Sequence, residues 1–206
     1  MSVPRRRYLL GALAGSAVML TGCAVPGQPV AANIAAERGD MVLTNQEVDA
    51  LADAWTFATD REISRREIIS LELLREPLAA ATDQIGFDYT RSDARLYAEM
   101  LMEEKGETGE PSEELIDVME GSLLVAAFTV LPTDLSAITA VAQDVEADAV
   151  TDTRAGSFEA DGYIELLSQV ATIATNAASA GETYWFLLFA GAPGLYDEDV
   201  AWIASE

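Results

Sequence analysis

Most of the chain after residue 44 carries apolar residues at the three- and four-residue spacing that places them on one face of a helix. The helices predicted from this spacing begin near residues 44, 64, 90, 112, 132 and 158. The first three begin at a capping box, in which a Ser or Thr hydroxyl and an acidic side chain satisfy each other's backbone amides. These pairs are Thr44 and Glu47, Ser64 and Glu67, and Thr90 and Asp93. The predicted fold is mainly α, with six or so helices in an orthogonal bundle.

One proline lies inside a predicted helix. Pro77 falls within the second helix, where it removes a backbone donor and its ring clashes with the preceding turn. We therefore predict a kink near Leu73 and Leu74, with the helix continuing beyond the proline.

Extended segments are predicted near both ends of the chain. Residues 30–43 contain two short apolar pieces around a polar turn at Gly39. The aromatic and aliphatic run Tyr184–Phe189 predicts a strand, and the alternation within residues 199–204 predicts a second one after a Gly- and Pro-containing turn. Such neighbouring strands can pair through a short loop, and the run near Ile34 could join them. A small β hairpin, or extended strands formed by the termini, completes the predicted fold.

The N-terminus has the layout of a secretory leader. Arg5, Arg6 and Arg7 precede an apolar run, residues 8–20, that falls short of the about 20 residues needed to span a bilayer. It ends in Leu20-Thr21-Gly22-Cys23, which resembles the lipobox of bacterial lipoproteins. The resemblance implies a diacylglyceryl group on the Cys23 sulfur and cleavage between Gly22 and Cys23. The alternative for this single cysteine is a buried or reactive free thiol.

A lipid on Cys23 would decide where the protein resides. Two or three acyl chains hold a protein at a membrane almost permanently, so we expect a tether on the outer face of the cytoplasmic membrane, in the cell envelope. The run Arg5–Leu10 loosely resembles a twin-arginine export signal, and the general secretion route stays open as the alternative. The predicted organisation is a signal peptide over 1–22, a flexible spacer over 23–37 and one helical domain over 38–206.

Charge and composition exclude several classes of function. The leader carries three of the twelve Lys and Arg residues and none of the 35 Asp and Glu residues. The mature chain therefore has nine basic against 35 acidic residues, a formal charge of −26, which disfavours nucleic acid as a partner. Histidine is absent, which removes Ser-His-Asp triads and His-ligated metal sites. We expect no cofactor and no metal.

The order of elements resembles one family, the N-terminal domain of SurA-type periplasmic folding factors. The resemblance rests on the extended segment and helix start Gly39–Asp49, on the following helix with Ile69 to Leu74, and on the helix start Thr90-Arg91-Ser92-Asp93-Ala94. It implies that the domain holds unfolded or exported polypeptide in an apolar groove. The parvulin domain of isomerase-active relatives has no counterpart in these 206 residues, and the family's closing segment has at best a degenerate counterpart at Ala192–Tyr196.

We therefore expect a non-catalytic, membrane-anchored protein that binds polypeptide clients. The candidate groove side chains are large and apolar, and ordinary core packing is the alternative for each: Trp55, Phe57, Tyr97, Met100, Met119 and Phe128. The rival interpretation is a structural or accessory subunit of an envelope complex that docks through the aromatic run Tyr184–Phe189. In a third interpretation, an enzyme, carboxylate pairs such as Glu113 and Glu114, or Asp197 and Asp199, would act as acid and base. Adjacent acids at a helix start more often complement its dipole.

Overall fold

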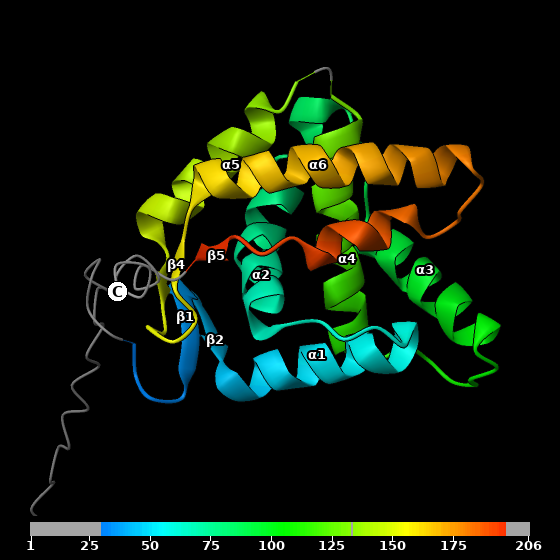
Figure 1. The fold of residues 1–206 in the computed structure, drawn as a ribbon. Coiled ribbons are helices and arrows are strands. Elements are labelled where there is room, and N and C mark those ends of the chain that lie inside the picture. The colour runs from blue at the N-terminus through cyan, green and yellow to red at the C-terminus, as the bar shows by residue number, and fades with distance from the viewer. Residues whose placement is uncertain (1–29, 133, 197–206) are drawn as a thin grey trace, which may run out of the picture.

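Six α-helices make up most of the computed structural model, which describes residues 30–132 and 134–196 (Figure 1). Two short 3-10 helices accompany them, and the mainly α prediction is confirmed. The helices are α1 (Asn45–Thr59), α2 (Arg65–Ala80), η1 (Thr82–Ile85), α3 (Arg91–Glu104), α4 (Glu113–Val130), α5 (Ser136–Asp148), α6 (Ala160–Ser179) and η2 (Trp185–Gly191).

Helix α4 lies at the centre of the fold. Thirteen of its eighteen residues are buried, because its sequence is apolar or small nearly all the way round rather than along one stripe. It packs against α1, α2, α3, α6 and η2. In Figure 1, α2 and α4 stand between α1 and α6, which run crosswise to them on opposite sides. This arrangement is the crossed helix packing that was predicted.

The predicted capping boxes start three of the helices. At α1 the backbone amide of Thr44 donates to a Glu47 carboxylate oxygen at 2.7 Å, and the Glu47 amide donates to the Thr44 hydroxyl at 3.2 Å. The same reciprocal pairs begin α2 and α3. Helix α2 then continues through Pro77 to Ala80, as predicted for a helix that does not stop at its proline.

A hairpin and a third strand form a small sheet beside the helices. Strands β1 (Ile34–Arg38), β2 (Met41–Thr44) and β3 (Val150–Thr151) are antiparallel in the order β2-β1-β3. Gly39 adopts a φ of 57° at the hairpin turn, a conformation that glycine adopts without strain. The predicted spacer over residues 23–37 is wrong at its end, because β1 begins at Ile34 and buries that residue in a strand. The small side chains after it, which suggested a spacer, let β1 pack closely on α2.

The aromatic run near the C-terminus forms a helix, so the predicted strand over Tyr184–Phe189 is wrong. These residues lie mostly in η2, whose side chains Phe186 and Phe189 are buried three positions apart. An uninterrupted apolar run suits a buried helix as well as a buried strand, and periodicity does not separate the two. The strand that follows, β5 (Leu195–Tyr196), pairs with β4 (Ser157–Phe158). The second predicted strand, residues 199–204, lies outside the described residues.

Candidate functional site

Three of the six predicted groove residues lie in the hydrophobic core. Trp55 is 3% exposed, and Met119 and Phe128 are fully buried. The prediction that these three line an accessible groove is therefore wrong. Met119 and Phe128 belong to α4, where nearly every face meets another element, so their burial follows from the central position of that helix.

The other three candidates are accessible but do not form one groove. Phe57 is 52% exposed, and the ammonium group of Lys105 lies 5.4 Å from the centre of its ring. Met100 is half-buried on α3. Tyr97 is half-buried as well, and its ring packs edge-on against Phe186 with 4.9 Å between the ring centres. Tyr97 is the one candidate that lines the apolar pocket described next.

An apolar pocket of about 250 Å³ lies between α3, α4, η2 and the segment before α3. Its lining is mostly aromatic and aliphatic, and we call it the apolar pocket: Phe87, Asp88, Tyr89, Asp93, Tyr97, Leu123, Ala126, Ala127, Leu131, Trp185 and Phe186. Ala126, Ala127 and Phe186 are buried, whereas Leu131 is 56% exposed. The pocket thus has a closed apolar base and an open side.

The charged residues that line the apolar pocket are both acidic. Asp88 and Asp93 are its two charged lining residues, and Asp88 is exposed. Residues 30–196 hold 31 Asp and Glu against nine Lys and Arg, so the body around the pocket is also strongly acidic. An apolar side chain flanked by Lys or Arg would match both the pocket and its surroundings.

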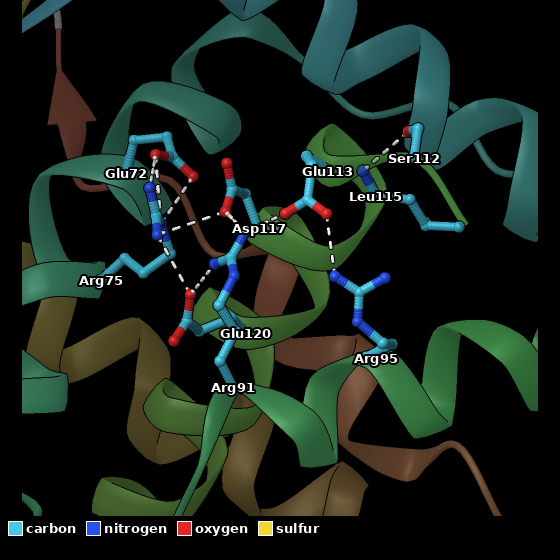
Figure 2. Close-up of polar contacts among 9 residues, drawn as sticks. All are labelled: Glu72, Arg75, Arg91, Arg95, Ser112, Glu113, Leu115, Asp117 and Glu120. Atoms are coloured by element: carbon cyan, nitrogen blue, oxygen red, sulfur yellow. Dashed lines mark hydrogen bonds and ion pairs between the residues drawn. The ribbon is translucent and has the colours of Figure 1, made fainter. Parts of the chain in front are cut away.

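A cluster of arginines and carboxylates ties three helices together (Figure 2). Its members come from α2, α3 and α4, and we call them the arginine–carboxylate cluster: Glu72, Arg75, Arg91, Arg95, Glu113, Asp117 and Glu120. Arg75 donates to Glu72 at 2.9 Å and to Glu120 at 3.0 Å. Arg91 donates to the same Glu120 carboxylate from α3. Guanidinium groups on two helices therefore share one buried carboxylate on a third.

The cluster's carboxylates are held by arginine, which limits their chemistry. Burial raises the pKa of Glu72, and the charge and hydrogen bonds of Arg75 oppose that rise. Hydrogen bonds from Arg95 and Arg91 lower the pKa of Glu113 at the start of α4. Glu113, which is stabilised as an anion in this way, is a weak base, since protonation would break its ion pairs. Glu113 accordingly acts as a helix-start acid and an arginine partner. The second carboxylate pair named as an acid–base candidate, Asp197 and Asp199, lies outside the described residues.

Within residues 30–132 and 134–196, no group of three or more acidic or cysteine side chains is placed to hold a metal ion. Over the same part of the chain, no helix combines the length and apolar character needed to cross a bilayer. The predicted lipidation and cleavage residues, Cys23 and Gly22, lie outside it.

No known protein family, no curated protein and no solved structure matches this chain. Of the pocket residues, Tyr97 and the aromatic run were predicted from the sequence, whereas Phe87, Leu123 and Leu131 were not. Phe87 follows a turn at Gly86, and no periodic pattern marks it as part of a site. Only the packing of α3, α4 and η2 brings these residues together.

Proposed function

We propose that this chain is a lipid-anchored protein of the cell envelope that catalyses no reaction and docks one protein partner through the apolar pocket. The apolar pocket itself carries the proposal, because half-buried aromatic side chains and the exposed Leu131 surround a closed apolar base. Aromatic anchors in pockets of this kind supply much of the energy of protein interfaces. The lipobox-like Leu20–Cys23 supports the anchor and the location outside the cytoplasmic membrane.

The size of the pocket favours an accessory subunit over a general chaperone. At about 250 Å³ it is smaller than the range of about 300–1,000 Å³ typical of small-molecule sites, and it suits one large side chain. A chaperone that holds extended chains needs a longer apolar surface, and three of the residues expected to provide it are buried. We infer a partner segment with one aromatic or aliphatic anchor flanked by Lys or Arg.

A SurA-like holding function is the second candidate, because large apolar side chains are exposed at separate places on the domain. Within residues 30–132 and 134–196, five are at least half exposed: Val42, Phe57, Leu96, Leu131 and Ile173. Dispersed apolar contacts can hold many unfolded clients weakly without making the protein itself aggregate. This candidate agrees with the resemblance to SurA-type domains, which implies binding of polypeptide clients.

Site-specific photo-crosslinking from Leu131 in the native host tests the docking proposal. Ile173 is the matched control, because it is an equally exposed large aliphatic residue on α6, outside the apolar pocket. We expect position 131 to give one dominant adduct, whose crosslinked peptide has an apolar residue flanked by basic ones. Position 173 should not give this adduct, and Leu131→Asp should abolish copurification of the partner. The same crosslinks from both positions, or none from either, would contradict docking at this pocket.

Aggregation assays separate the two candidates. The mature protein, added in molar excess to several unrelated unfolding proteins, should leave their aggregation unchanged if it serves one partner. Suppression of aggregation for most of them, together with many adducts from both crosslinking positions, would instead favour the chaperone.

Metabolic labelling with a fatty-acid analogue tests the anchor. Label should appear on the wild-type protein and vanish from Cys23→Ala, which should also leave the membrane fraction. An unlabelled wild-type protein would contradict the lipid anchor and the location at the membrane that depends on it.

A further inference from the structure

A second cavity, whose lining carries basic side chains, lies where β1, the first turn of α2 and the segment after β3 meet. Its volume is about 720 Å³, against about 250 Å³ for the apolar pocket. Three arginines line it, and we call it the arginine cavity: Arg65 and Arg66 from α2, and Arg154 from the loop between β3 and β4. Ala32 and Ala35, at the start of the described chain, also line it.

The gathering of cations here is unusual for so acidic a body. Residues 30–196 contain nine basic residues, and three of them line this one cavity. Among the described residues that line the cavity, Asp152 is the single acid. Elsewhere Arg75, Arg91 and Arg95 are engaged in the arginine–carboxylate cluster. The arginine cavity is therefore a place where a negatively charged group meets several guanidinium groups on a protein that otherwise repels it.

Two of the three arginines, Arg65 and Arg154, form ion pairs of the weak, solvent-exposed kind. Arg154 donates from Nε and Nη2 to Asp152, and its side chain is 77% exposed. Arg65 pairs with Asp49 and Asn45 from α1, with a side chain 43% exposed. Exposed pairs contribute about 0–1 kcal/mol, so a bound anion can share or replace them at small cost. Each guanidinium has five N–H donors, and planar guanidinium groups suit the paired oxygens of a phosphate.

The position of the cavity relates it to the membrane. Ala32 is the ninth residue after Cys23, and a fully extended segment of that length spans about 30 Å. A lipid on Cys23 would therefore keep the cavity within about that distance of the bilayer surface. This step rests on the proposed anchor, whereas the anion-binding chemistry of the arginines does not.

We propose that the arginine cavity binds a phosphate group, carried by an anionic lipid headgroup or by a soluble phosphate ester. Arg65, Arg66 and Arg154 recognise the phosphate oxygens, and the size of the cavity leaves space for the group esterified to them. A headgroup bound there would hold the acidic body in one orientation at the membrane.

Calorimetric titration of the full chain in uncharged detergent, with inorganic phosphate and with glycerol phosphate, tests the chemistry. The double variant Arg66→Gln/Arg154→Gln should bind at least ten-fold more weakly than the wild type. Arg61→Gln is the control for loss of an arginine, because it removes one positive charge at an exposed position outside the cavity, and it should bind as the wild type does. Thermal melts of all three proteins establish that each is folded.

Flotation with vesicles distinguishes the source of the phosphate. Vesicles of phosphatidylcholine with and without phosphatidylglycerol are compared, using the unacylated Cys23→Ser chain so that the anchor does not contribute. Binding of the soluble probes indicates a phosphate ester, whereas binding confined to phosphatidylglycerol vesicles indicates a lipid headgroup. Whichever binding is found should be lost in the double variant and kept in Arg61→Gln. Equal behaviour of the wild type and the double variant with every probe would overturn the inference. Leu131→Asp should retain phosphate binding, so failure at the apolar pocket is separable from failure here.

Discussion

At the scale of single residues, Gly121 shows how closely the central helix is packed. A Cβ placed on Gly121 would lie 2.6 Å from Cγ of Leu71 on α2, and both residues are buried. We predict that Gly121→Ala lowers the free energy of unfolding by about 1–3 kcal/mol, because overpacking in a filled core forces side chains off their preferred rotamers. Urea denaturation of the variant and the wild type measures this loss.

A double mutant locates the cause of that loss. Leu71→Ala alone leaves a void and should cost about 2–5 kcal/mol. In Gly121→Ala/Leu71→Ala the new methyl group enters the void, so the double variant should lose less stability than the two single variants combined. Strict additivity would show that the loss in Gly121→Ala does not arise from contact with Leu71.

The capping box at α1 makes a prediction that depends on pH. The backbone and hydroxyl hydrogen bonds from Thr44 lower the pKa of Glu47. A carboxyl group whose pKa is lower in the folded than in the unfolded state stabilises the fold at pH values above its unfolded pKa. This contribution is lost as the pH falls through the folded pKa. Glu47→Gln should therefore cost up to about 1 kcal/mol at neutral pH and progressively less below about pH 4. Urea titrations across this range measure the difference, with the exposed Glu62→Gln as the control. A cost that stays constant with pH would contradict the role of the charge.

At the scale of elements, the arginine–carboxylate cluster fixes α2 and α3 to α4. Glu120 is 6% exposed and accepts from Arg75 and Arg91. We predict that Glu120→Leu destabilises the fold by about 2 kcal/mol. The loss is below the about 3–5 kcal/mol of a fully buried broken pair, because Glu72 and Asp117 still face Arg75.

Thermal unfolding compares Glu120→Leu with Glu114→Leu. Glu114 lies on the exposed side of the same helix, so its substitution should change stability by less than about 0.5 kcal/mol. Equal effects of the two substitutions would mean that the cluster contributes no more than a surface carboxylate does.

The helices could be predicted from the sequence because their starting signals are local. Thr44, Ser64 and Thr90 each carry the partner acid three residues away, and each starts a helix in the structure. The aromatic run was misassigned because its apolar residues are continuous, and the two-residue strands β3, β4 and β5 are too short to show a period. Packing of distant elements decided their conformation.

The two candidate sites also depend on the packing of distant elements, so they could not be predicted from the sequence. The apolar pocket joins Phe87 to Trp185, and the arginine cavity joins Arg65 to Arg154, although each pair is far apart in the chain. The groove prediction selected large apolar residues by type, and type alone does not separate the buried Phe128 from the exposed Phe57. Burial is set by which helix becomes central, and that choice depends on the whole bundle.

At the scale of the whole molecule, the charge imbalance acts on stability as well as on partners. The described residues hold 31 acids and nine bases, and three of these bases are engaged in the arginine–carboxylate cluster. Outside the cluster, 27 acids remain against six bases in the described residues. Their repulsion is stronger in the folded body than in the expanded chain, because folding brings like charges closer together.

Screening this repulsion should stabilise the protein. At neutral pH the melting temperature should rise as NaCl increases from 20 to 300 mM, because the screening length falls from tens of ångströms to less than about 10 Å. The opposite trend, melting at lower temperature in salt, would be expected if the ion pairs of the arginine–carboxylate cluster dominated.

Near pH 4 about half of the carboxyl groups are protonated, so the same change in salt should have little effect on the melting temperature. Calorimetric scans at the two pH values separate the sources: a salt-induced rise at neutral pH that disappears near pH 4 assigns the effect to the acidic surface. An equal rise in melting temperature at both pH values would exclude the acidic surface as its source.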